Sequence, residues 1–110
     1  MIKETITQIE ARIEKAESLN DAKKKELLDL LSTLKTEIFE LSKTHAEHCR
    51  SITGFAEVSI HEAMREEKNP QLLELSLQGL STSVEGLEVS HPKLVGAVNS
   101  ICFTLSNIGI

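Results

Sequence analysis

Two histidines and a cysteine lie within five positions of the sequence, at His45, His48 and Cys49. On a helix, spacings of three and four residues place such side chains near one face. Imidazole nitrogens and thiolate sulfur are ligands of zinc and copper. A neighbouring imidazolium can also lower the pKa of a cysteine thiol and make it reactive. The cluster is therefore the candidate for a metal site or a reactive cysteine.

The rest of the sequence offers little to complete such a site. A structural zinc site takes four ligands, and no second His or Cys pair occurs at a matching spacing. Glu47 does not directly follow His45, so the order is not the HExxH order of zinc proteases. We expect His45, His48 and Cys49 to be polar residues in a helical interface, with a metal- or redox-responsive site as the alternative. No cofactor and no catalytic residue is expected.

The composition favours helices. The chain has 110 residues, of which 40% are hydrophobic and 26% charged, and its only aromatic residues are three phenylalanines. Sheet proteins draw on aromatic and β-branched residues, so this scarcity favours helices built on Leu and Ile. The formal net charge is −5. Because an acidic surface repels phosphate groups, neither nucleic acid nor an anionic membrane is expected as a partner.

The sequence also bears on the compartment. Its first residues, MIKETITQIE, do not resemble a signal peptide, and no apolar run approaches the length that spans a bilayer. Two cysteines are too few for a disulfide scaffold, and without an export signal we expect them to be reduced. The expected location is the cytoplasm.

Apolar residues recur at alternating spacings of four and three, the pattern of helices with one buried face. We expect a single all-α domain, an antiparallel helical bundle with coiled-coil-like seams. Its four helices are predicted at about 2–18, 21–67, 70–88 and 92–108. The predicted seams are Ile2, Ile6, Ile9, Ile13 and Ala16; Leu27, Leu31, Leu34, Ile38 and Leu41; Leu73, Leu77, Leu80, Val84 and Leu87; and Leu94, Val98, Ile101, Leu105 and Ile108.

The second helix is predicted to be unusually long, because its seam continues through His45 and His48 to Ile52 and Phe55. An unbroken helix over 21–67 would be about 70 Å long. Helix propensity falls near Gly54, so a kink or short break there is the alternative. A helix of that length leaves apolar surface beyond the reach of its shorter neighbours. We therefore expect a homodimer.

A stripe of small residues runs beside the third seam, at Ser76, Gly79, Ser83 and Gly86. Glycine inside a helix costs about 1 kcal/mol relative to alanine. Two glycines on one helical face therefore indicate a place where another helix approaches closely. The alternative is a weak, frayed helix.

The C-terminal segment LEVSHPKLVGAVNSICFTLSNIGI resembles an uncharacterised family of small bacterial proteins, domain of unknown function 4404. The resemblance implies an all-helical, cytoplasmic bacterial protein, and the family brings no known activity, cofactor or catalytic residue. His91 and the terminal Gly-Ile are where a shared function would be sought, with a helix start and a helix cap as the alternative. The matching positions are Leu87, Glu88, His91, Pro92, Leu94, Leu105, Gly109 and Ile110, with Ile108 where the family usually has Met.

These observations favour a small interaction or regulatory module that self-associates and has no enzymatic activity. Its partner is expected to be a second copy of the chain, with an unidentified protein partner also open. The alternative function is a metal- or redox-responsive protein that uses His45, His48 and Cys49.

Overall fold

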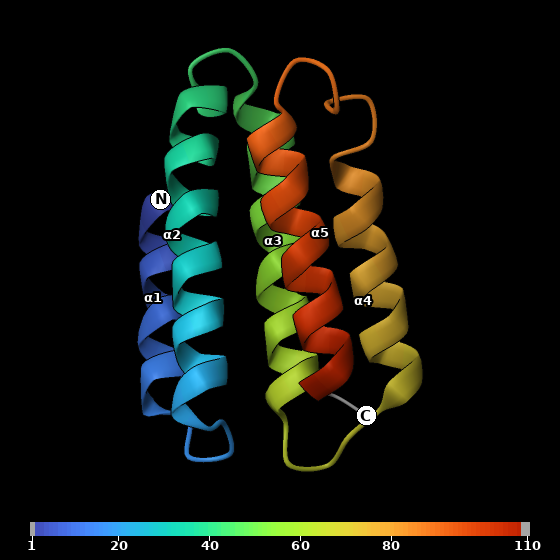
Figure 1. The fold of residues 1–110 in the computed structure, drawn as a ribbon. Coiled ribbons are helices and arrows are strands. Elements are labelled where there is room, and N and C mark those ends of the chain that lie inside the picture. Colours follow the sequence, from blue (N-terminus) through green and yellow to red (C-terminus); the bar gives the residue numbers. More distant parts are fainter. Residues whose placement is uncertain (1, 109–110) are drawn as a thin grey trace.

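The computed structural model describes residues 2–108, and over that range it contains five helices and no strand. The helices lie alongside one another, and each runs in the direction opposite to the one before it (Figure 1). The predicted all-α class is therefore confirmed. The helices are α1 (Ile2–Lys15), α2 (Asp21–Ser42), α3 (Ala46–Met64), α4 (Pro70–Ser83) and α5 (Pro92–Ile108).

The core forms where the predicted apolar faces meet. α5 packs against α2, α3 and α4, while α1 covers α2 and α3 on the other side. Burying an aliphatic side chain contributes roughly 1.5–3 kcal/mol, so these faces hold the helices together. The fully buried large side chains include Ile6, Ile9, Ile13, Leu27, Leu31, Leu34, Ile38, Leu41, Ile52, Ile60, Leu80, Leu94, Ile101 and Leu105.

The long central helix predicted over 21–67 is wrong. The chain turns back at residues 43–45, and the two halves become the antiparallel helices α2 and α3 (Figure 1). The His45 N–H donates to the Leu41 carbonyl at 2.8 Å, and the Thr44 hydroxyl donates to the same carbonyl at 3.4 Å. Reversal lets both halves bury their apolar faces within a molecule 37 Å long. Gly54 lies inside α3, with no break there.

Two helices end earlier than predicted. α1 stops at Lys15 rather than residue 18, and α4 stops at Ser83 rather than residue 88. Gly86 has a φ of 89°, a left-handed conformation that ends helices and that glycine adopts without strain. The prediction that Gly86 continues the helical small-residue stripe is therefore wrong.

Asparagine side chains fix two of the helix starts. Asn20 Oδ1 accepts from the Lys23 N–H at 2.8 Å, and Asn69 Oδ1 accepts from the Leu72 N–H at 3.1 Å. Each bond satisfies a backbone donor that has no partner within its helix. Pro70 follows Asn69 at the first position of α4, and the helix begins at residue 70 as predicted. Within residues 2–108, no helix is both long and apolar enough to cross a membrane.

Candidate functional site

The His–Cys cluster lies at the start of α3, and its members face in different directions. His45 precedes α3, and its Nδ1 lies 2.7 Å from the Thr44 hydroxyl oxygen. His45 and His48 are both exposed, so they do not continue the buried face of α2 beyond Leu41. The reason is the reversal at 43–45, because α3 starts a new buried face. Its core residues are Cys49, Ile52, Ala56, Ile60 and Ala63.

Cys49 points into that core, away from the exposed histidines. Its thiol is fully buried and donates to the Ile38 carbonyl of α2, with 3.6 Å between sulfur and oxygen. Burial raises the pKa of the Cys49 thiol, which keeps it protonated and weakly nucleophilic. No group of three or more His, Cys, Asp or Glu side chains within residues 2–108 is arranged to hold a metal ion.

His91 lies directly before the first residue of α5, Pro92. Its carbonyl accepts from the Val95 N–H at 3.2 Å, and its Nδ1 lies 2.9 Å from the Ser90 hydroxyl oxygen. The helix-start alternative for His91-Pro92 therefore accounts for this residue. Gly109 and Ile110, the other positions singled out by the family resemblance, lie outside the described residues.

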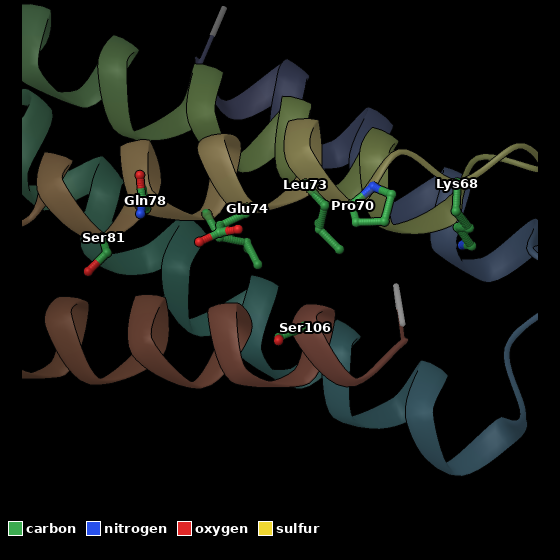
Figure 2. Close-up of a pocket in the computed structure, with 8 residues that line it drawn as sticks. Lys68, Pro70, Leu73, Glu74, Gln78, Ser81 and Ser106 are labelled. Atoms are coloured by element: carbon green, nitrogen blue, oxygen red, sulfur yellow. The ribbon is translucent and has the colours of Figure 1, made fainter.

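A groove with a volume of about 660 Å³ lies between α4 and α5 (Figure 2). Leu73 and Leu77 line it from α4, and Ser106 lines it from α5 (Figure 2). The partly buried Cys102 thiol donates to the Leu77 carbonyl at 3.8 Å, and burial raises its pKa. The Cys102 thiol is therefore protonated near neutral pH and weakly nucleophilic.

Four large apolar side chains gather instead on the outer side of α3 and α4. Phe55 and Val58 of α3 are 40% and 47% exposed, and Leu72 and Leu75 of α4 are 43% and 61% exposed. Within each helix the two residues are three apart and so share a face. We call these four residues the α3–α4 patch.

A contact between Phe55 and Gly79 joins the two halves of this patch. A Cβ atom at Gly79 would lie 2.3 Å from the Phe55 ring, so the ring occupies the space that any side chain would need. Leu75 is one helical turn from Gly79. The exposed apolar residues of α3 and α4 therefore lie on adjoining surfaces, and the predicted close approach at Gly79 is confirmed. The rest of the small-residue stripe is buried beside it, at Ser76 and Ser83.

Gly54 belongs to the same outer face. It lies one turn before Val58, and a Cβ atom there would meet nothing within 4 Å. A glycine inside a helix costs about 1 kcal/mol, and no neighbouring group within the described chain requires it. Because Gly54 has no side chain, the surface beside the α3–α4 patch is lower there, and we call this position the hollow.

Other exposed apolar side chains do not form such a group. Phe39 is 54% exposed, but the Lys3 and Lys43 ammonium nitrogens lie 5.9 Å and 5.2 Å from its ring centroid. Val89 lies in the loop between α4 and α5, and Phe103 lies on α5.

The predicted seams do not include Val58, Leu72 or Leu75, because these residues do not follow the spacing of the buried apolar residues. They could have been recognised as large apolar residues at positions where an amphipathic helix presents polar ones.

No family model, no curated protein and no solved structure matched the chain.

Proposed function

We propose that this protein is a non-catalytic interaction module that self-associates through the α3–α4 patch. In this proposal the five helices form an antiparallel bundle with coiled-coil-like seams. The protein is cytoplasmic and bacterial, as expected from the sequence. The exposed apolar group of Phe55, Val58, Leu72 and Leu75 carries the proposal. Contiguous apolar surface of this kind is typical of protein–protein contacts.

The distribution of charge on this face, like its apolar content, is typical of a protein–protein interface. The outer positions of α3 nearest α4 include the uncharged Ser51, Gly54 and Val58, whereas the exposed Arg50 and the half-buried Glu57 lie on the side of α3 away from α4. Depletion of charge at the centre and charged groups at the margin are features of protein interfaces. α4 adds the uncharged Gln71 beside Leu75, whereas the exposed Glu74 and Gln78 line the groove with α5.

The size of the face sets the expected strength. α3 is about 28 Å long, and two adjacent helices are about 20 Å wide, so one copy offers about 560 Å². Two copies together bury about 1,100 Å², close to the lower limit of about 1,200 Å² for stable specific interfaces. We therefore expect a dissociation constant in the micromolar range.

Sedimentation velocity over a range of protein concentrations tests this function. The unaltered chain is expected to shift from monomer to dimer as its concentration rises. Leu75→Asp places a charge in the patch and should weaken the dimer by about two orders of magnitude. Phe103→Asp makes a comparable change on α5 and should leave association unchanged. Equal effects of the two substitutions would argue against the patch.

A further inference from the structure

The outer face of α3 carries a pattern that is complementary to itself when reversed. Glu47, Gly54, Val58 and Arg65 follow one another at spacings of seven, four and seven residues. Residues 7, 11 and 18 positions apart lie close to the same direction around a helix of 3.6 residues per turn. Ser51 and His61 are exposed near the same line, at equal distances from residue 56, so the line on α3 reads acid, hydroxyl, hollow, knob, imidazole, base.

From this pattern, and resting on the proposed function, we infer that the partner is a second copy whose α3 packs antiparallel to the first about a two-fold axis near residue 56. In a two-fold interface, if residue i contacts residue j, then j contacts i. Reversal about residue 56 pairs Gly54 with Val58 of the second copy, and Glu47 with Arg65. Both kinds of contact then occur twice.

The central contact is steric. Val58 is 47% exposed, and the space above Gly54 is empty within 4 Å. The side chain of one copy fits the hollow of the other, as a knob fits a hole between packed helices. Leaving out a side chain at Gly54 brings the two helices closer, which accounts for a glycine that no group within the described chain requires.

The outer contacts are electrostatic. Glu47 is exposed in the first turn of α3, and Arg65 lies at the C-terminal end of that helix. They are separated by about 27 Å along the helix, too far to pair within one copy. Arg65 Nη1 already donates to Glu62 Oε1 at 2.8 Å. Because a guanidinium has five N–H donors, Arg65 can bind Glu62 and Glu47 of the second copy together.

A second copy suits this face better than an unrelated protein. The acid and base stand at equal distances from the proposed axis, and so do the hollow and the knob. A two-fold operation matches all four positions at once, whereas an unrelated partner would need an independent set of complementary groups. The same operation lays α4 beside α4 of the second copy, which covers Leu75.

Charge reversal tests this register. Glu47→Arg alone and Arg65→Glu alone each turn both outer contacts into like-charge contacts, so each variant should dimerise at least about tenfold more weakly. An equimolar mixture of the two variants restores both contacts in the mixed dimer. We expect the mixture to associate nearly as tightly as the unaltered chain in sedimentation velocity.

The outcomes separate the register from the proposed function. If the unaltered chain dimerises but the mixture stays as weak as its components, the antiparallel register is wrong and self-association stands. If the unaltered chain remains monomeric throughout, both are wrong. Thermal unfolding followed by circular dichroism checks that each variant folds, since Arg65→Glu also removes the bond to Glu62.

If Arg65→Glu fails to fold, cysteine cross-linking tests the antiparallel register independently. In a Cys102→Ser background, Gly54→Cys mixed with Val58→Cys should form a disulfide-linked dimer on mild oxidation. Each variant by itself should cross-link much less, because like positions lie about 6 Å apart along the paired helices. Equal cross-linking in all three samples would overturn the register.

Discussion

The ring of Phe55 in α3 occupies the space in which a side chain at Gly79 of α4 would lie, with 2.3 Å from the ring to the position of a Cβ atom. This contact sets how closely α3 and α4 approach. It also brings the exposed apolar residues of α3 and those of α4 into one surface. The surface that we propose for self-association thus depends on a packing feature inside a single copy.

Gly79→Ala should lower the free energy of unfolding by about 1 kcal/mol. Alanine gains about 1 kcal/mol in helix propensity, but the methyl group must displace the Phe55 ring, and such overpacking costs about 1–3 kcal/mol. Urea unfolding at low protein concentration measures the difference. Gly54→Ala is the matched control and should raise stability, because nothing lies within 4 Å of the added methyl. Equal stabilisation by both substitutions would show that the ring does not fill the space.

Gly54→Ala should also weaken the dimer while it stabilises the monomer. The methyl group fills the hollow that we assign to Val58 of the second copy. Gly96→Ala is the control, since Gly96 of α5 also has nothing within 4 Å and lies away from the α3–α4 patch. It should raise the melting temperature without changing the dissociation constant. An unchanged dissociation constant for Gly54→Ala would contradict the proposed contact.

Cys49 should resist alkylation in the folded protein. Its thiol is fully buried, and burial raises its pKa above the ordinary value of 9.0. At near-neutral pH it stays protonated, so iodoacetamide should modify the partly buried Cys102 first. Mass spectrometry of the digested protein measures the order. Rapid modification of Cys49 would instead favour the reactive-cysteine alternative.

Stability should fall in alkaline solution for the same reason. A thiol with a raised folded-state pKa contributes stability below its unfolded pKa, and this contribution is lost as the pH rises above that value. The loss should therefore begin near pH 9.0. Comparing the pH dependence of unfolding for the unaltered chain and for Cys49→Ala isolates this contribution. Identical alkaline slopes would contradict it.

Asn69→Ala should cost about 1 kcal/mol of stability. The substitution removes the acceptor for the Leu72 N–H at the start of α4, and loss of such a cap typically costs about that much. Asn107→Ala is the control, because Asn107 is exposed near the end of α5. Thermal unfolding distinguishes the two. A larger loss for Asn107→Ala would be unexpected on this account.

The helical class and most of the core could be predicted because burial imposes a helical period on the sequence. Ile6, Ile9 and Ile13 show this in α1, as do Leu94, Val98 and Ile101 in α5. The reversal at 43–45 could not be predicted in this way. Its residues, Lys43, Thr44 and His45, include neither glycine nor proline, and the predicted spacing of four and three continues from Leu41 through the two histidines to Ile52.

That reversal also changes the argument for self-association. The predicted dimer rested on a helix too long for its neighbours to cover, and no such helix exists. The basis is now the α3–α4 patch, whose residues become neighbours only when α3 and α4 pack through Gly79. Contacts between distant segments of this kind leave no periodic signal in a single sequence. The metal alternative loses its geometric basis through the same turn, since His45 and His48 are exposed while Cys49 is buried.

The most direct test of self-association through the patch compares Val58→Asp with Val89→Asp by sedimentation velocity. The two substitutions are chemically identical, and Val89 is 96% exposed in a loop outside the patch. We expect Val89→Asp to dimerise like the unaltered chain and Val58→Asp to remain monomeric at the same concentrations. Dimerisation of Val58→Asp with an unchanged dissociation constant would contradict the account.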